Sequence, residues 1–288
     1  MYDLPSEYPE EPGLPDQFHL LQPQLLRRTL RLNNYSSDNY LIASNLNLYY
    51  DVNHILWHKR PDWFLAVDVP YLYDGEELRW SYVVWQEGKS PYVVIELLSP
   101  GTEVEDLGRF YDETSKITDT ESAIPAVNPE ENISQPTATK FPTKLEVYEK
   151  YLQVPHYIVY SRYTQKLRYF KWSGGQYQEQ SLNLENPMVW LADLEIGLGI
   201  WEGVFENVPY YWLRWCDRAG NWRLTDIEQS EQRLEPSEQR LEQERAAKEQ
   251  AEAKLMQAAR NLMETGMEIE EVAQILGLSE VQLKALQS

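Results

Sequence analysis

The chain has 288 residues, enough for one sizeable domain with appendages, and its single cysteine excludes an internal disulfide framework or a cysteine-based zinc site. The net charge of −20 argues against a broad nucleic-acid-binding surface, although it allows one locally basic groove or an acidic site that a divalent cation neutralises. Because no apolar run reaches the length of a membrane span and no signal pattern opens the chain, we expect a soluble, cytoplasmic protein that does not enter a membrane.

The N-terminal stretch, residues 1–16, carries four prolines and five acidic residues but no lysine or arginine. This composition predicts a flexible acidic arm. The main domain is then expected over residues 17–227. It begins with a leucine-rich stretch from Gln17 to Asn34, which has roughly helical spacing and whose start Pro23 should limit.

A first acidic residue of interest, Asp62, follows a proline at the start of a strand-like run. Pro61 favours an extended chain before it, and Trp63–Val67 is typical of a β-strand. Further on, Asp74–Gly75 is a turn signal and Trp80–Trp85 is strand-like, which together predict a hairpin. A Pro-Asp pair is most often a turn, so Asp62 gains meaning only from the residues around it.

A second acidic residue, Glu96, interrupts an otherwise apolar run. Residues 93–98 are apolar except for this glutamate, and Ser99–Pro100–Gly101 ends the run. The pattern predicts a short strand that is buried on both faces. A carboxylate at such a position is costly unless it is paired, hydrogen-bonded or bound to a metal. Glu96 is therefore either satisfied by a structural lysine or arginine, or it is a metal ligand.

Two helices are expected to flank a long insertion. The first runs from Thr102 to Tyr111, with Thr102 as a plausible N-cap and Glu105 three residues later. Residues 112–142 lose all periodicity and are rich in Thr, Ser, Glu, Asn and Pro, which predicts a mobile insertion. The pattern of Thr143–Leu152 then predicts an amphipathic helix. Further strands are expected at 156–160, 166–172, 176–180 and 194–201, and an aromatic stretch closes the domain at 207–223.

The C-terminal part changes in character after residue 227. Residues 228–258 predict a charged helix in which apolar residues recur at only one position per heptad, whereas a robust coiled coil needs two. We expect weak self-association at most, which leaves a homodimer open. Pro236 should interrupt or start this helix. Residues 259–288 predict a small helical tail with helix-turn-helix character. Its second helix has one lysine and no arginine. We therefore favour a small helical tail that packs within the protein over one that recognises a DNA sequence.

Four segments taken together carry a resemblance to a known family: Arg60–Leu65, Val94–Thr102, Thr143–Glu149 and Val154–Tyr160. They resemble the PD-(D/E)XK nuclease superfamily and, more closely, its bacterial restriction-endonuclease-like branch, formerly described as a domain of unknown function. The similarity covers roughly residues 30–201. It implies an α/β fold in which a mixed sheet is flanked by helices, here with a helical C-terminal extension.

The resemblance also implies a site. Asp62 and Glu96, with the carbonyl of Leu97, would hold Mg²⁺ or Mn²⁺, since hard oxygen ligands suit these ions. The superfamily's usual lysine would stand at position 98, where this chain has leucine. In the branch that this chain resembles, the lysine moves to the following helix, which indicates Lys144. Lys116 and Lys140 are the alternatives for the catalytic lysine. Asp106 and Tyr148 would complete the site through hydrogen bonds.

The function that the resemblance implies is metal-dependent endonuclease activity on DNA. Such an enzyme needs an activated water and a group that stabilises the charge developing on the phosphate. The alternative is a catalytically inactive scaffold with the nuclease fold, which acts as an interaction protein through its helical tail. The strong acidity of the chain favours this alternative, whereas Asp62, Glu96 and Lys144 favour the enzyme.

Overall fold

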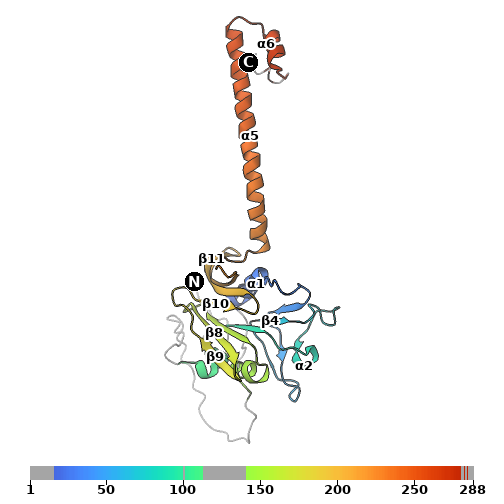
Figure 1. Ribbon diagram of the computed structural model, residues 1–288, viewed down its shortest axis with the longest axis vertical. Helices are drawn as coiled ribbons and strands as arrows, with labels where there is room; N and C mark the ends of the chain where they lie inside the picture. Colours follow the sequence, from blue (N-terminus) through green and yellow to red (C-terminus); the bar gives the residue numbers. More distant parts are fainter. Residues whose placement is uncertain (1–15, 100, 113–140, 280–281, 283, 285–288) are drawn as a thin grey trace, which may run out of the picture. The chain divides into compact units, whose positions relative to one another are not determined.

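The computed structural model describes residues 16–99, 101–112, 141–279, 282 and 284, with the backbone alone at 234–239. The chain divides into two units, Met1–Thr225 and Asp226–Ser288, which are described separately (Figure 1). The predicted arm lies outside the described residues except for Asp16. The predicted insertion does so except at its edges, residues 112 and 141–142.

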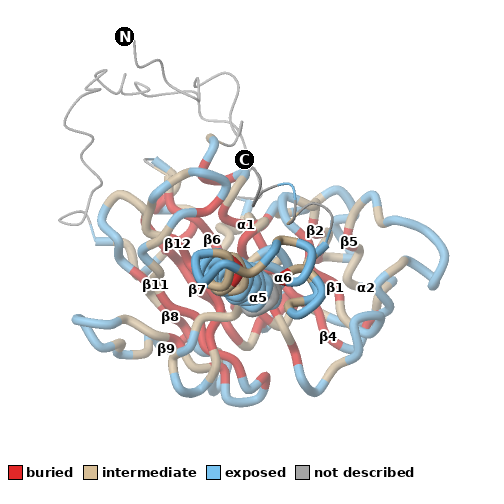
Figure 2. Tube along the Cα trace, turned by 90° about the horizontal axis from the view of Figure 1, so that it is seen from above, coloured by how far each residue is buried: buried red, intermediate tan, exposed pale blue. Residues whose placement is uncertain are grey.

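A mixed six-stranded sheet organises the first unit, in the order β1-β4-β6-β7-β8-β9. The strands β6 and β7 pair in parallel and all other neighbours pair antiparallel. Figure 2 shows the strands at the centre of this unit as buried. Every residue of β4, β6 and β7 is buried, which explains their near-continuous apolar sequences. The strands are β1 Tyr40–Ala43, β4 Trp63–Val67, β6 Val93–Leu97, β7 His156–Ser161, β8 Lys166–Ser173 and β9 Gln176–Gln180.

Helix α1 (Gln17–Thr29) and an antiparallel three-stranded sheet share a hydrophobic core with one face of the large sheet. The Gln22 amide exchanges two hydrogen bonds of 2.8 Å with the backbone of Leu213, which fixes α1 to this sheet. The predicted limit at Pro23 is wrong. The helix begins six residues earlier because Asp16 caps it and accepts a hydrogen bond from the backbone of His19. The three strands are β10 Met188–Leu191, β11 Ile196–Phe205 and β12 Val208–Cys216.

A second core covers the other face of the large sheet. The prediction of a strand over Trp80–Trp85 holds only for its two central residues. Only Tyr82–Val83 (β5) is extended, and it pairs in parallel with β2 (Leu48–Tyr49) instead of returning as a hairpin. The chain then turns into α2 (Val84–Glu87). Burial of the Tyr82 ring, whose hydroxyl donates to the Lys89 carbonyl at 2.9 Å, fixes this turn. Strand β3 (His58–Lys59) completes this small sheet.

A pair of short helical segments lies at each end of the predicted insertion. The first is α3 (Glu103–Leu107) with a 3₁₀ turn, η1 (Gly108–Phe110), and the second is α4 (Lys144–Glu146) with a π-helical turn, η3 (Val147–Tyr151). Thr102 precedes α3 but does not cap it. Its hydroxyl donates instead to the Ser99 carbonyl at 3.1 Å. Gly108 ends α3 with a φ of +48°, and a Cβ there would lie 2.7 Å from Leu145 Cδ2. Glycine therefore allows α3 and α4 to approach closely.

The second unit consists of α5 (Asp226–Glu264) and α6 (Ile269–Leu276). Helix α5 runs through position 236 without a break, so the predicted interruption at Pro236 is wrong. Proline removes one backbone donor, and a helix of 39 residues persists without that single bond. Ala259 and Val272 are buried where the two helices meet. The second helix of the predicted helix-turn-helix lies mostly outside the described residues. No described helix is long and apolar enough to span a bilayer.

Candidate active site

The carboxylate of Glu96 is the centre of the candidate site. Glu96 lies on β6, and its side chain is completely buried. Its Oε1 accepts a hydrogen bond of 2.6 Å from the Tyr148 hydroxyl. Its Oε2 accepts one of 3.0 Å from Lys144 Nζ and one of 3.3 Å from the backbone N–H of Asp62. The structure thus surrounds the glutamate with three donors, and a lysine is one of them.

Lys144 reaches Glu96 from the first residue of α4. Thr143 and Glu146 form a capping box, which fixes the start of this helix. The backbone N–H of Lys144 donates to Glu105 on α3 at 3.1 Å, so the two helical pairs are tied together here. The Lys144 ammonium also lies 3.0 Å from Asp106 Oδ1. This contact is the second ion pair that the Lys144 ammonium makes with a buried carboxylate.

Asp62 and the segment Glu96–Leu97 are linked in both directions. The Asp62 backbone donates to the Glu96 carboxylate, and the Leu97 backbone donates to Asp62 Oδ2 at 2.7 Å. This arrangement follows from the antiparallel pairing of β4 with β6, in which Trp63 lies opposite Ile95. The sheet therefore brings Asp62, just before β4, next to Glu96, near the end of β6.

The site contains more negative charge than its lysine balances. Burial raises the pKa of Glu96 to about 7, although Lys144 opposes the shift. Burial likewise raises the pKa of Asp106 to about 6. Burial alone would lower the pKa of Lys144, but Asp106 and Glu96 together raise it well above its usual value. Lys144 is therefore a permanent cation among three carboxylates.

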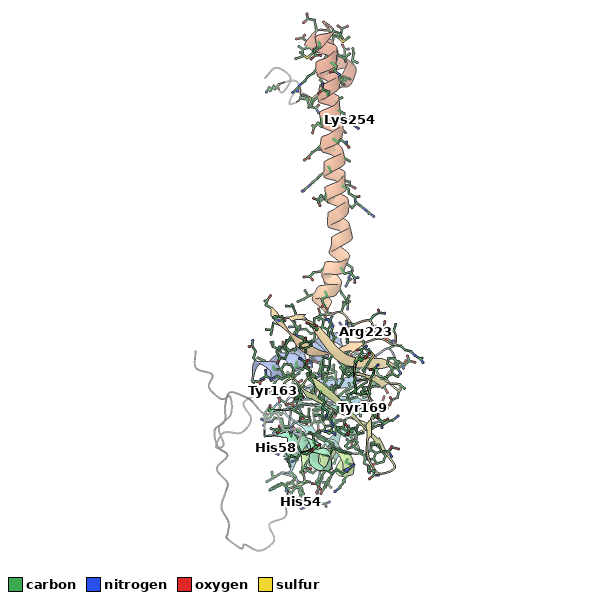
Figure 3. All side chains as sticks on the ribbon, turned by 90° about the vertical axis from the view of Figure 1, so that its left-hand side faces the viewer. His54, His58, Tyr163, Tyr169, Arg223 and Lys254 are labelled. Carbon is green, nitrogen blue, oxygen red and sulfur yellow. The ribbon has the colours of Figure 1, made fainter. Side chains whose placement is uncertain are left out.

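This surplus charge and the kinds of donor present fit a divalent cation. Two carboxylates, Asp62 and Glu96, and the Leu97 carbonyl form an all-oxygen set of the kind that Mg²⁺ and Mn²⁺ prefer. In the described part of the chain, no group of three or more His, Cys, Asp or Glu side chains could hold a metal, so this set consists of two carboxylates and one backbone carbonyl. His54 and His58, labelled in Figure 3, turn to Asp51 and to the Leu56 carbonyl, respectively.

Sequence reasoning missed one side chain at the site, His19. Its Nε2 lies 3.0 Å from the Leu97 carbonyl oxygen and 3.2 Å from Ser99 Oγ, and its Nδ1 lies 2.8 Å from Asp16 Oδ1. The prediction that residues 1–16 are all flexible arm is wrong at Asp16. This residue caps α1 and also pairs with Arg162 at 2.6 Å. An aspartate three residues before a histidine at a helix start was the available signal.

Every predicted site residue lies in this cluster: Asp62, Glu96, Leu97, Asp106, Lys144 and Tyr148. Tyr148 lies one helical turn after Lys144, and burial together with the adjacent Glu96 raises the pKa of its hydroxyl well above the usual value. The alternative lysines, Lys116 and Lys140, lie outside the described residues.

Comparisons with known proteins were made against families, curated proteins and solved structures. No curated protein and no solved structure matches the chain. One family model, Uma2, described as "putative restriction endonuclease", matches residues 2–204. The match includes every residue of the cluster around Glu96 and covers well over half of the 288 residues. The α/β fold with its mixed sheet is consistent with a restriction-endonuclease-like domain. The chain therefore belongs to the Uma2 family of restriction-endonuclease-like proteins.

Proposed function

We propose that this protein is a metal-dependent endonuclease that hydrolyses phosphodiester bonds in DNA. The observation that carries the proposal is the contact of Glu96 with both Asp62 and Lys144 in a member of this family. Two carboxylates that can hold a divalent cation, next to a lysine that stays charged, are the groups that phosphodiester hydrolysis requires.

Each residue has a distinct task in the proposed reaction. Asp62, Glu96 and the Leu97 carbonyl would hold Mg²⁺ or Mn²⁺. When bound, the ion polarises the phosphate and lowers the pKa of a water molecule. Lys144 positions that water or stabilises the charge that develops on the phosphate oxygens. It is suited to this task because Glu96 and Asp106 hold its ammonium from two sides at 3.0 Å.

Tyr148 and Asp106 act indirectly. The Tyr148 hydroxyl occupies Glu96 Oε1 and so fixes the rotation of the carboxylate, and Asp106 fixes the Lys144 ammonium. Tyr157 in turn donates from its hydroxyl to the Asp106 backbone carbonyl at 2.7 Å. The reacting groups are thus supported by buried residues from β7, α3 and η3, which is the arrangement that a precise site needs.

The alternative function is a catalytically inactive scaffold that acts through its helical tail. The net charge of −20 favours it, because a DNA substrate carries negative charge along its whole length. Under this alternative, Lys144 serves only to neutralise buried carboxylates. Fold and family membership do not separate the two functions, since the same fold can carry active and inactive sites.

An experiment with paired variants separates these functions. Mn²⁺ titration calorimetry and nicking of supercoiled plasmid DNA are measured on the parent, Asp62→Asn and Glu96→Gln. Each change keeps the side-chain volume and removes one negative charge, so both Mn²⁺ affinity and nicking should fall. Asp68→Asn is the control, because Asp68 follows the same strand β4 but is exposed and pairs with Lys89. A parent that neither binds Mn²⁺ nor nicks DNA would support the scaffold.

A further inference from the structure

A second hydrogen-bond network enters the site from α1. It runs from Arg162 to Asp16, from Asp16 to His19 and from His19 to the Leu97 carbonyl. The His19 side chain is buried against the end of β6. Because Leu97 directly follows Glu96, this network ends one peptide bond from the centre of the candidate site.

The contacts of His19 show which ring nitrogen donates to Leu97. Nδ1 lies 2.8 Å from Asp16 Oδ1 and Nε2 lies 3.0 Å from the Leu97 carbonyl oxygen. A carbonyl oxygen only accepts hydrogen bonds, so Nε2 carries the hydrogen in this contact.

Both backbone polar groups of Leu97 are held by side chains from other elements. Its N–H donates to Asp62, which precedes β4, and its carbonyl accepts from His19, which belongs to α1. Hydrogen bonding with the neighbouring strand β7 resumes at the next residue, where the Leu98 N–H donates to the Tyr160 carbonyl at 2.8 Å. Side chains rather than a neighbouring strand therefore fix the direction of the Leu97 carbonyl.

We propose that His19 is a positioning residue of the site. Braced by Asp16, its Nε2–H donates to the Leu97 carbonyl and so holds the Glu96–Leu97 segment in the orientation that the proposed metal site needs. The part of this inference that concerns the metal rests on the proposed function. The part that concerns the segment does not, and it can be tested without a metal.

The test compares two substitutions of His19. His19→Leu fills the space without a donor, whereas His19→Gln keeps an N–H that can reach the carbonyl. Gln22→Leu is the structural control, because Gln22 also anchors α1 but bonds to Leu213 and not to the site. Thermal melting of all three variants reports how far each change weakens the domain as a whole.

The first readout is hydrogen exchange of the amides in residues 93–99 of the metal-free protein. His19→Leu should raise exchange in this segment about tenfold beyond its effect on global stability, and His19→Gln should restore most of the protection. Gln22→Leu should raise amide exchange in this segment no more than its loss of global stability accounts for. Equal exchange in the parent and in His19→Leu would overturn the proposal.

The second readout is Mn²⁺ affinity together with the kcat and KM of plasmid nicking. Residues that orient metal ligands change affinity or activity by about 10–100-fold. We expect a loss of this size in His19→Leu, seen in kcat more than in KM, and partial rescue in His19→Gln. If the parent neither binds Mn²⁺ nor cleaves, the proposed function fails, and the exchange measurement still decides the role of His19.

A measurement on the parent covers the case in which His19→Leu does not fold. Nitrogen-15 spectra of the histidine rings should show a hydrogen on His19 Nε2 that is protected from exchange by its bond to the Leu97 carbonyl. An Nε2 without a proton, which accepts from the Ser99 hydroxyl 3.2 Å away, would also overturn the proposal.

Discussion

Lys144 Nζ lies 3.0 Å from Glu96 Oε2, although the two residues are 48 positions apart in the chain. The chain between them contains α3 and the stretch for which an insertion was predicted, and it returns to the site at the capped start of α4. The lysine that contacts Glu96 is thus supplied by a helix, whereas position 98, just after β6, carries leucine. This contact makes Lys144 the most informative residue to change.

Replacing Lys144 by alanine should abolish most cleavage while Mn²⁺ binding persists or tightens. The substitution removes a cation next to carboxylates that would bind the ion, and it removes the group that acts on the phosphate. A loss of roughly a hundredfold or more in nicking rate is expected for one such group. Plasmid nicking and Mn²⁺ titration calorimetry on the same preparation check the two effects.

The matched control for this prediction is Lys150→Ala. Lys150 lies on the same helical segment, but its side chain is 60% exposed and pairs with Glu146 at 3.2 Å. It should change neither nicking nor Mn²⁺ affinity. Melting curves are needed, because removing one partner of a buried ion pair costs about 3–5 kcal/mol. If Lys144→Ala is folded and cleaves like the parent, Lys144 is misassigned, and Lys140 and Lys116 become the next candidates.

Tyr148→Phe should weaken both stability and cleavage without changing the shape of the core. The phenylalanine ring fills the same space, but Glu96 Oε1 loses its donor at 2.6 Å. Losing a hydrogen bond to a charged group costs about 1.5–3 kcal/mol. Urea unfolding and plasmid nicking measure the two effects. Tyr151→Phe, on the same segment but 45% exposed, is the control, and equal behaviour of the two variants would contradict the role of Tyr148.

The strands and the two acidic residues could be predicted from the sequence because their signals are local. A buried apolar run marked β6 and singled out Glu96, and the Pro-Asp pair marked the start of β4. The partner of Glu96 could not be predicted in this way. Lys144 was indicated only by resemblance to a family, since pairing across 48 residues depends on the three-dimensional fold and not on spacing.

The wrong predictions share a physical cause, which is that tertiary contacts overrode local pattern. Trp80–Trp85 has strand-like composition, but burial of Tyr82 and the turn into α2 leave only two residues extended. Asp16 belongs by composition to an acidic arm, yet it caps α1 by accepting from the His19 backbone N–H, and it also pairs with Arg162. The composition of a segment does not reveal that its last residue contacts a distant part of the chain.

Acid should destabilise the protein through His156, which is buried on β7 between Tyr169 and Asp193 (Tyr169 is labelled in Figure 3). Burial lowers the pKa of His156 below its usual value, so the folded state keeps the ring neutral while the unfolded chain takes up a proton. This contribution to stability is therefore present above pH 6.5, the ordinary histidine value, and is lost as the pH falls below it. Urea unfolding at several pH values should show the loss, and His156→Gln should reduce it. An equal pH dependence in the parent and the variant would contradict this prediction.

A chain that ends at Thr225 should fold and keep the candidate site. The first unit, Met1–Thr225, contains both hydrophobic cores formed by the large sheet and all the residues of the site. The shortened protein should unfold cooperatively at a temperature close to that of the full chain and bind Mn²⁺ with equal affinity. Calorimetry and titration check these outcomes. Loss of cooperative unfolding would mean that residues 226–288 belong to the core of the domain.

Arg109 and Glu149 form an ion pair in which only the glutamate is buried, so its two partners should not cost the same to remove. Arg109 donates to both oxygens of Glu149 at 2.6 and 2.7 Å, which ties η1 to η3. The Glu149 side chain is 4% exposed, whereas that of Arg109 is 44% exposed. Glu149 Oε1 also accepts from the backbone N–H of Tyr177 at 2.5 Å. Without Arg109, the carboxylate stays buried without a counter-charge, but without Glu149 the arginine can turn to water.

Arg109→Ala should therefore destabilise the protein by about 3 kcal/mol, the lower end of the range for breaking a buried pair, because water already screens the exposed arginine. Glu149→Gln keeps an acceptor for the Tyr177 backbone and should cost only about 1–2 kcal/mol. The double variant should cost less than the sum, because the glutamine leaves no buried charge for Arg109 to neutralise. Urea unfolding of the three variants measures these values. The exposed pair of Lys89 and Asp68, joined at 3.6 Å, is the control and should contribute at most about 1 kcal/mol. Equal costs for Arg109→Ala and Glu149→Gln would show that burial of the carboxylate does not control the stability of this pair.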